Sequence, residues 1–259
     1  PYSIYENIFK LNPGNILKIS LDRCEPIIEE YWSLIQVAKS NKIAKKFKSE
    51  EDTINELEVL LNSVIKQQMQ ADVPVGAFLS GGIDSSTIVS LMQKQSSKPI
   101  NTFTIGFENK IYNEALQAKE ISKFLGTRHT ELYLTSKEAL DVIPKLPNLY
   151  CEPFADSSQI PTFLIAKLAS NKVKVALSGD GGDELFGGYN RYTITKNFWN
   201  KISYMPVWGR SFLSAGIKLL SPETWNFISD PIQATVPKSF RLNNLGDKLY
   251  KASRVITKK

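Results

Sequence analysis

The sequence predicts an α/β fold, a parallel sheet flanked by helices, followed by a helical C-terminal part. Between residues 49 and 177, apolar runs of strand length alternate with segments whose apolar residues recur at helical spacing. This alternation is typical of right-handed βαβ units with parallel strands. Two of the strands run directly into glycine-rich turns, at the strand ends where an open sheet of this class binds its ligand.

The first residues of the chain follow a different pattern. Residues 4–11 and 16–19 predict two paired strands joined by a turn at Pro13-Gly14, because Pro-Gly is strong turn chemistry. Residues 33–48 are rich in lysine and predict a linker to the βαβ region.

Several helix ends in the central region carry their own signals. Ser49 and Asp52 predict the start of one helix, and Gly126 predicts the end of another. A capping box of Thr135 and Glu138 predicts the start of a helix that ends before Pro144 or runs on to about Leu149. Strands are expected over residues 73–79, 100–105, 129–134 and 173–177, and helices over residues 85–95, 113–125 and 158–170.

The first glycine-rich turn follows the apolar strand 73–79 and reads Ser80-Gly81-Gly82-Ile83-Asp84-Ser85-Ser86, with a helical pattern directly after it. Free backbone N–H groups and the helix dipole at such a junction hold a phosphate. The turn lacks the Gly-Lys-Ser/Thr ending of a P-loop, so phosphate binding is expected without a kinase or GTPase function. The structural alternative is a plain glycine turn between a strand and a helix.

The second turn follows the strand 173–177. It reads Ser178-Gly179-Asp180-Gly181-Gly182-Asp183-Glu184 and continues to Tyr189. Acidic residues at the carboxyl end of a strand lie where an open α/β sheet places its ligand. The structural alternative is an acidic surface loop, but aromatic residues follow closely and favour packing over solvation.

The first turn resembles the pyrophosphate loop of the ATP-pyrophosphatase superfamily, whose members cut ATP between its α and β phosphates. With the second turn, the chain resembles the synthetase domain of glutamine-dependent asparagine synthetases. Four further segments strengthen the resemblance: residues 103–107, 125–129, 151–158 and 189–192. The resemblance implies a Rossmann-like fold of the adenine nucleotide alpha hydrolase type. It also implies that residues 1–35 are the tail of an N-terminal glutaminase domain with its linker, and that residues 36–259 are an ATP-pyrophosphatase domain without its C-terminal end.

The resemblance assigns roles to residues of both turns. Asp84 and Asp183 match the carboxylates that hold Mg²⁺, and Asp180 matches a catalytic acid that is a glutamate in close relatives, one methylene longer. Glu184, Glu152 and Asp156 could face the substrate or play structural parts, and both interpretations stay open. ATP and its pyrophosphate are expected to contact Phe78, Ser80, Gly81, Gly82, Asp84, Ser85, Ser86, Ile105, Ser178 and Gly179.

The function that the resemblance implies is ATP-dependent amidation of L-aspartate to L-asparagine through a β-aspartyl-AMP. The ammonia would come from glutamine hydrolysis in the glutaminase domain, and a homodimer is an assembly that the resemblance allows. One alternative is an amidotransferase that acts on a sugar acid or closes a β-lactam ring. Another is a nucleotide-binding fragment without turnover, and weak or absent synthetase turnover is expected of this stretch by itself.

Composition excludes several other functions. The net charge is +6, but the lysine clusters match no known nucleic-acid-binding module and are interpreted as solvated faces, so nucleic-acid binding is not expected. Two cysteines far apart give neither a disulfide framework nor a zinc site, and no apolar stretch is long enough to span a membrane. These features predict a reduced, cytoplasmic protein. His129, the one histidine, and Cys151 are expected to be structural.

Overall fold

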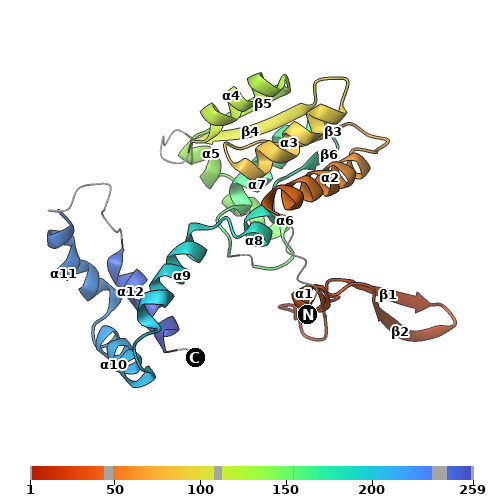
Figure 1. Ribbon diagram of the computed structural model, residues 1–259. Helices are drawn as coiled ribbons and strands as arrows, with labels where there is room; N and C mark the ends of the chain where they lie inside the picture. The colour runs from red at the N-terminus through yellow and green to blue at the C-terminus, as the bar shows by residue number, and fades with distance from the viewer. Residues whose placement is uncertain (1, 44–48, 108–112, 154, 235–243, 258–259) are drawn as a thin grey trace. The chain divides into compact units, whose positions relative to one another are not determined.

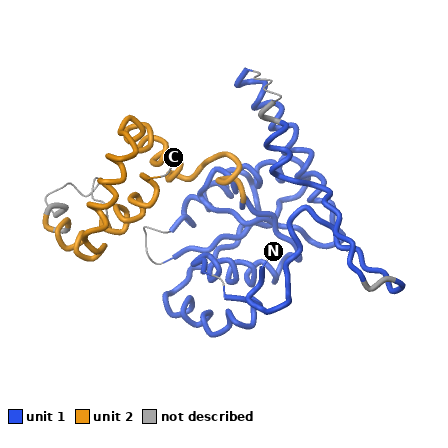
Figure 2. The backbone as a smooth tube through the Cα atoms, turned by 90° about the horizontal axis from the view of Figure 1, so that it is seen from below, with its two compact units in different colours: residues 1–180 blue, residues 181–259 orange. Residues whose placement is uncertain are grey.

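The computed structural model describes residues 2–43, 49–107, 113–153, 155–234 and 244–257. The chain divides into two compact units, residues 1–180 and 181–259, which are coloured separately in Figure 2. The first unit holds the sheet and the second is helical, as predicted. The proposed boundary between a glutaminase tail and the synthetase domain at residue 35 stays a prediction.

The first unit is built on a parallel four-stranded sheet in the order β5-β4-β3-β6 (Figure 1). The strands are β3 (Val75–Phe78), β4 (Asn101–Phe107), β5 (Arg128–Leu134) and β6 (Val175–Leu177). The chain moves outward from β3 to β4 and β5, then returns to add β6 on the other side of β3. The predicted parallel α/β sheet is therefore confirmed, with a topological switch point between β3 and β6.

Helices pack on both faces of this sheet (Figure 1). On one face, α2 (Glu50–Gln68), α3 (Ile83–Gln95) and α4 (Ala115–Leu125) form a core with Ala77 and Leu79. On the other face, α7 (Gln159–Ser170) packs against Phe78 and Phe103. Successive residues of a strand point to opposite faces, so the run Ala77-Phe78-Leu79 alternates between these two cores.

The helix-end signals are confirmed because they act locally. The Ser49 hydroxyl accepts a hydrogen bond from the N–H of Asp52 (3.1 Å) at the start of α2. Thr135 and Glu138 form the predicted capping box at the start of α5 (Ser136–Leu140). Of the two ends considered for this helix, the one before Pro144 is confirmed, and the run to Leu149 is wrong. Pro144 and Pro147 lack N–H donors, so the segment breaks into a 3₁₀ turn (Ile143–Lys145) and α6 (Leu146–Leu149).

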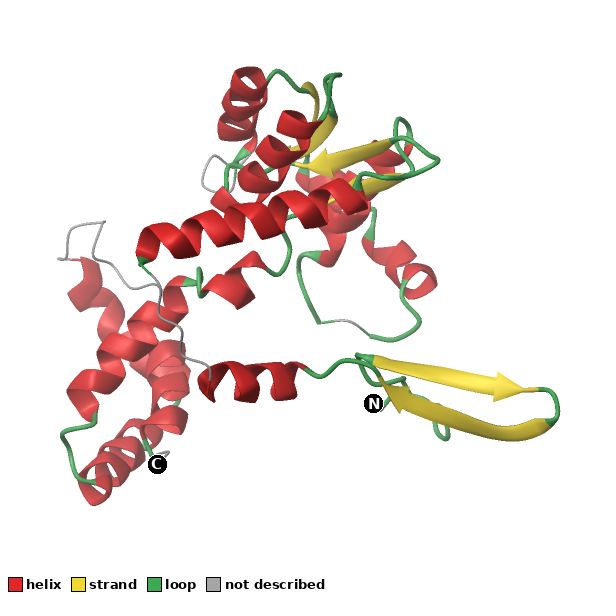
Figure 3. Cartoon of the chain, turned by 45° about the vertical axis from the view of Figure 1, so that its right-hand side comes forward, coloured by secondary structure: helices red, strands yellow, loops and turns green. Residues whose placement is uncertain are grey.

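The N-terminal strand pairing differs from the prediction. Strands β1 (Asn15–Ser20) and β2 (Arg23–Glu30) form the antiparallel hairpin, drawn as long arrows in Figure 3. Of the expected strand 4–11, Phe9 alone takes part in a bridge, an isolated one with Tyr2. Pro13-Gly14 lies at the open end of the hairpin, because the Gly14 carbonyl accepts the N–H groups of Tyr31 (2.9 Å) and Trp32 (3.2 Å).

The expected linker at residues 33–48 is also wrong in part, since α1 (Leu34–Ile43) occupies most of it. Residues 33–48 contain neither proline nor glycine, and the N–H of Val37 bonds to the Ser33 carbonyl (3.0 Å) at the start of the helix. Residues 44–48 lie outside the described part of the chain.

The second unit is a set of helices: α8 (Gly182–Phe186), α9 (Asn190–Ile202), α10 (Val207–Lys218), α11 (Pro222–Ala234) and α12 (Leu245–Ile256). Its core joins Ile202, Ile217 and Ile256. The Ser214 hydroxyl donates to the Ser253 carbonyl (2.8 Å) and fastens α10 to α12. Among the described residues of the whole chain, no helix combines the length and apolarity required to cross a membrane.

We expect Gly126→Ala to lower the free energy of unfolding of the first unit by about 1 kcal/mol. Gly126 ends α4 with φ +70°, a left-handed backbone that alanine disfavours, while no atom within 4 Å would clash with an added Cβ. Urea unfolding checks this, with Gly126→Asn as the control because asparagine tolerates this backbone at lower cost. Equal stability of the alanine variant and the wild type would contradict it.

Candidate functional site

Two loops leave neighbouring strands at the switch point of the sheet. Residues 80–82 follow β3, and residues 178–180 follow β6, whose Leu177 pairs with Ala77 of β3. Because the two strands are parallel and adjacent, both loops start at the same edge of the sheet. This edge is where an open α/β sheet forms its ligand crevice.

The first loop is held in shape by its own serines. The Ser85 side chain is buried, and its Oγ accepts the N–H of Ser80 (3.0 Å) and lies 2.8 Å from the Ser80 Oγ. The Ser80 Oγ in turn accepts the N–H of Gly82 (3.1 Å). The Ser86 hydroxyl donates to the Gly82 carbonyl (2.7 Å). These bonds set the loop geometry without a ligand, so the three serine hydroxyls already serve the loop itself.

Helix α3 begins directly after this loop with Gly82 as its N-cap, and no side chain caps it. Within the described part of the chain, the N–H groups of Ile83 and Asp84 have no hydrogen-bond acceptor. Such first-turn N–H groups, at the positive end of the helix dipole, attract anions. The Asp84 carboxylate lies in the same turn and is half-buried.

The second loop packs against the start of α3 at Gly179. A Cβ atom at this position would lie 2.7 Å from the backbone N of Ser85 and 3.0 Å from the backbone C of Asp84. Only glycine fits such an approach without displacing the helix end. The structure therefore brings Gly179 together with Asp84 and Ser85, although the two segments are far apart in sequence.

Asp180, the candidate catalytic acid, follows Gly179 and is exposed. Its backbone N–H bonds weakly to the Ser178 hydroxyl (3.4 Å), which shapes the loop. Phe78 and Ile105, expected at the adenine, lie toward the carboxyl ends of the adjacent strands β3 and β4, and both are half-buried. The side chain of Phe78 packs toward α7. Backbone contact with an adenine stays a prediction for both residues.

Asp183 and Glu184 lie in α8 of the second unit. Glu184 accepts a hydrogen bond from the Tyr189 hydroxyl (2.6 Å), which holds the pKa of the Glu184 carboxyl below its usual value. The same bond raises the pKa of Tyr189 to about 12. The Arg191 guanidinium lies 4.1 Å from the centre of the Tyr189 ring. Metal sharing between Asp183 and Asp84 stays a prediction.

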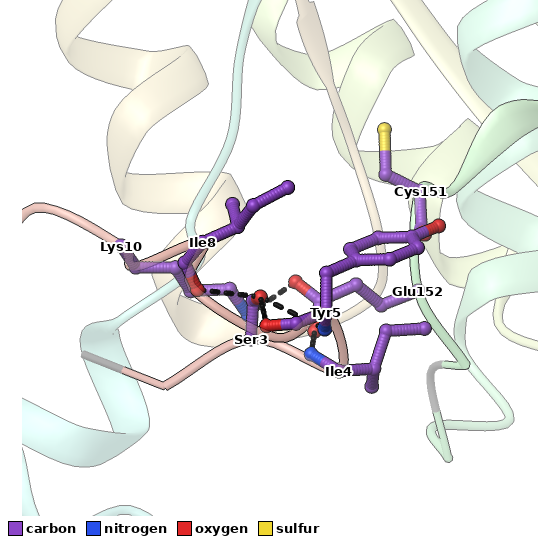
Figure 4. Close-up of polar contacts among 7 residues, drawn as sticks. All are labelled: Ser3, Ile4, Tyr5, Ile8, Lys10, Cys151 and Glu152. Carbon is purple, nitrogen blue, oxygen red and sulfur yellow. Dashed lines mark hydrogen bonds and ion pairs between the residues drawn. The ribbon is translucent and has the colours of Figure 1, made fainter.

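Glu152 is engaged by the N-terminal segment, as Figure 4 shows. One carboxylate oxygen pairs with Lys10 (2.6 Å) and the other accepts the N–H of Ile4 (3.2 Å). The hydrogen bond from Lys10 is the main reason that the pKa of Glu152 lies below its usual value. The Tyr5 hydroxyl donates to the neighbouring Cys151 carbonyl (2.9 Å). These contacts give Glu152 a structural part, and its substrate role remains a hypothesis.

Asp156 accepts the N–H of Ser158 (2.9 Å) just before α7. This backbone hydrogen bond lowers the pKa of the Asp156 carboxyl. The geometry is that of a turn residue that leads into a helix. Asp156 therefore also has a structural role, and its contact with substrate stays a prediction.

A family model described as "Asparagine synthase" matches residues 56–258, which include both loops and parts of both compact units. The chain belongs to the asparagine synthase family.

Curated relatives agree with this family assignment. The chain is 41% identical over 190 residues to the provisionally named glutamine-hydrolysing asparagine synthetase 2 of Methanocaldococcus jannaschii, covering 73% of this chain and 35% of the relative. It is 42% identical over 193 residues to the glutamine-hydrolysing asparagine synthetase 1 of Bacillus subtilis, covering 74% of this chain and 29% of the relative. The chain thus spans about a third of the length of the curated relatives it matches.

Among solved structures, an NH3-dependent NAD synthetase from Campylobacter jejuni, in complex with nitrate, is similar with a TM-score of 0.39 and 13% identity. The likeness covers 79% of this chain and 96% of that chain. Similarity at this level does not bear on the function of the asparagine synthase chain.

Sequence reasoning missed two residues that border the first loop of this asparagine synthase chain. The Thr104 hydroxyl donates to the Leu79 carbonyl, directly before the loop. Gln117 of α4 lies beside Gly81, where an added Cβ would be 2.9 Å from the Gln117 Cβ. Thr104 stands in a predicted strand and in the segment 103–107 that supports the resemblance, but nothing in the sequence points to its contact with Leu79, and no signal marks Gln117.

The residues of the site fit Mg²⁺ bound together with phosphate. Within the described residues, no three His, Cys, Asp or Glu side chains are grouped as a metal cage. Mg²⁺ usually takes one or two protein carboxylates and completes its shell with phosphate oxygens and water. Asp84, in the same turn as two free N–H groups, is placed to supply such a carboxylate beside a phosphate.

His129 has a structural setting on β5, as expected from the sequence. Its Nδ1 lies 2.9 Å from the Thr102 Oγ1. Its buried Nε2 has no partner among the described residues. Burial lowers the pKa of His129, while the nearby charges of Glu131 and Lys119 act in opposite directions. The imidazole is therefore held neutral within the sheet.

We expect Gly179→Ala to lower the free energy of unfolding by about 1–3 kcal/mol, because its Cβ must push against the backbone of Ser85. Thermal unfolding measures the loss. Gly82→Ala is the matched control, since its Cβ would meet only the Ser80 Oγ at 3.2 Å. Comparable stabilities for these two variants would show that the loops do not meet as described.

The first unit should become less stable as the pH falls below the ordinary histidine value of 6.5. The unfolded chain then binds a proton at His129 that the folded chain, with its lowered pKa, resists, so protonation favours unfolding. Urea unfolding at several pH values between about 5 and 7.5 tests this window. In His129→Gln this part of the pH dependence should vanish, and parallel profiles for the two proteins would contradict the assignment.

Proposed function

We propose that this chain carries the ATP-pyrophosphatase part of glutamine-dependent asparagine synthesis. ATP activates the side-chain carboxylate of aspartate as a β-aspartyl-AMP and releases pyrophosphate. Ammonia from glutamine hydrolysis in a glutaminase domain then displaces AMP and gives asparagine. A carboxylate is a poor acyl donor, and adenylation supplies the leaving group.

One observation carries the proposal: the loops after β3 and β6 meet at the start of α3. Gly179 of the second loop lies against Asp84 and Ser85 of the first, at the switch point of a parallel sheet. A site built from two loops of this kind can hold a long polyanion along its backbone N–H groups. Family membership adds that the relatives named as asparagine synthetases share this part of the chain.

The chain's own residues then divide the work. The N–H groups of Ile83 and Asp84 bind phosphate oxygens, and the Ser80, Ser85 and Ser86 hydroxyls keep the loop shaped around them. Gly81 and Gly82 allow the backbone to approach the β and γ phosphates. Catalysis of this type rests mostly on positioning the reactants and neutralising their charge.

The metal and acid roles complete the proposal. Asp84 and Asp183 would hold Mg²⁺, which, when bound, neutralises charge on the phosphates. The Asp180 carboxylate lies on the second loop and is exposed, so a substrate can reach it. Asp180 orients the acyl group and handles the ammonia proton. Ser178 and Gly179 contribute backbone contacts to the nucleotide, and Phe78 and Ile105 contact the adenine.

ATP–pyrophosphate exchange in the intact protein tests the substrate. Aspartate should support exchange that a panel of other carboxylates does not, because the proposed intermediate is an aspartyl adenylate. Exchange with a sugar acid or a β-lactam precursor in place of aspartate would assign the chain to another amidotransferase. Mg-ATP binding without exchange under any of these conditions would make it a nucleotide-binding fragment.

Asp84→Asn should reduce exchange at least about a hundredfold while the chain stays folded. The Asp84 carboxylate has no hydrogen-bond partner among the described residues, so its loss removes charge without breaking a structural bond. Asp72→Asn, an exposed site ahead of β3, is the matched control and should exchange like the wild type. Circular dichroism verifies the fold, and wild-type exchange in Asp84→Asn would remove Asp84 from the metal site.

A further inference from the structure

The backbone of Leu79, the last residue before the first loop, is tied to β4 at both its polar groups. Its N–H donates to the Phe103 carbonyl (2.9 Å), and its carbonyl accepts the hydroxyl of Thr104. Leu79 and Thr104 are only 2% and 3% exposed. Both hydrogen bonds are therefore shielded from water. If either partner is removed, water does not replace it.

The Thr104 bond compensates for the end of the strand pairing. The ladder between β3 and β4 joins Gly76, Ala77 and Phe78 to Asn101, Thr102 and Phe103, and it stops there. In a continued parallel ladder, the Leu79 carbonyl would accept a backbone N–H from β4. The chain instead leaves the sheet to form the loop, and the Thr104 hydroxyl takes the place of that N–H. A buried carbonyl without a donor would be costly.

We propose that Thr104 is a positioning residue for the phosphate-binding loop. Its hydroxyl fixes the point at which β3 turns into Ser80-Gly81-Gly82, and so sets where the N–H groups of Ile83 and Asp84 point. Threonine suits this task because its branched side chain has restricted rotamers in a strand. The inference rests on the proposed function where it concerns nucleotide binding, but the loop geometry itself can be tested without a nucleotide.

The same strand offers a matched control in Thr102. It is fully buried and lies on the same face as Thr104, two residues away. Its hydroxyl bonds instead to the Thr127 Oγ1 (2.9 Å) and the His129 Nδ1 (2.9 Å), toward β5 and the end of α4. Thr102→Val thus removes an equally buried hydroxyl that does not touch the loop.

Hydrogen exchange of the ligand-free chain tests the positioning role. In Thr104→Val, the hydrogen-bonded amides of Ser80 and Gly82 should exchange about tenfold faster, measured relative to the amides of β4 in the same protein. Thr104→Ser keeps the hydroxyl and should restore the wild-type rates. Thr102→Val should lose stability yet leave the exchange rates of the Ser80 and Gly82 amides unchanged. Equal loop exchange in the Thr104→Val and Thr102→Val variants would overturn the proposal.

Nucleotide binding provides the second readout. Thr104→Val should weaken Mg-ATP about tenfold and AMP much less, because the loop is proposed to hold the β and γ phosphates, which AMP lacks. Equal weakening of both nucleotides would overturn the positioning role. Should Thr104→Val not fold, Thr104→Ala replaces it in the same comparison with Thr104→Ser. A wild-type protein that binds no Mg-ATP defeats the proposed function, while loop exchange still decides the role of Thr104.

Discussion

The close contact between Gly179 and the first turn of α3 is the constraint on which the site depends. It exists because β6 returns to the side of β3 opposite β4, so that two loops from distant parts of the chain start side by side. A side chain at residue 179 would separate them. The absence of a side chain at this one position allows a helix terminus and an acidic loop to share one edge of the sheet.

The first loop is preorganised by bonds that do not involve a ligand. Ser85 and Ser80 are hydrogen-bonded to each other across the turn. Leu79 is bonded to β4 through both its N–H and its carbonyl. Internal bonds of this kind would lower the cost of ordering the loop around the proposed phosphate. They leave the N–H groups of Ile83 and Asp84 without an acceptor among the described residues. The serines expected to contact phosphate thus also act as the scaffold of the loop.

Prediction from the sequence succeeded where the signal and its effect lie within a few residues. Ser49, Gly126 and the Thr135–Glu138 pair each act on the helix end beside them, and the structure has all three. It failed at the N-terminus, where Pro13-Gly14 does supply a turn but the strand partner was misassigned. Strand register depends on which segments meet, and residues 23–30 proved a better partner for 15–20 than residues 4–11 did.

The sequence by itself determined the parallel α/β class, the two glycine-rich loops and their place after strands, because these follow from hydrophobic periodicity and local backbone preferences. Only the tertiary structure decided which side chains serve those loops. Thr104 bonds to Leu79, Gly179 packs on Ser85, and Glu152 is taken up by Lys10 and Ile4. Each of these contacts joins residues that are distant along the chain. Whether such residues meet in space depends on the order of strands in the sheet and on the path of the chain around it.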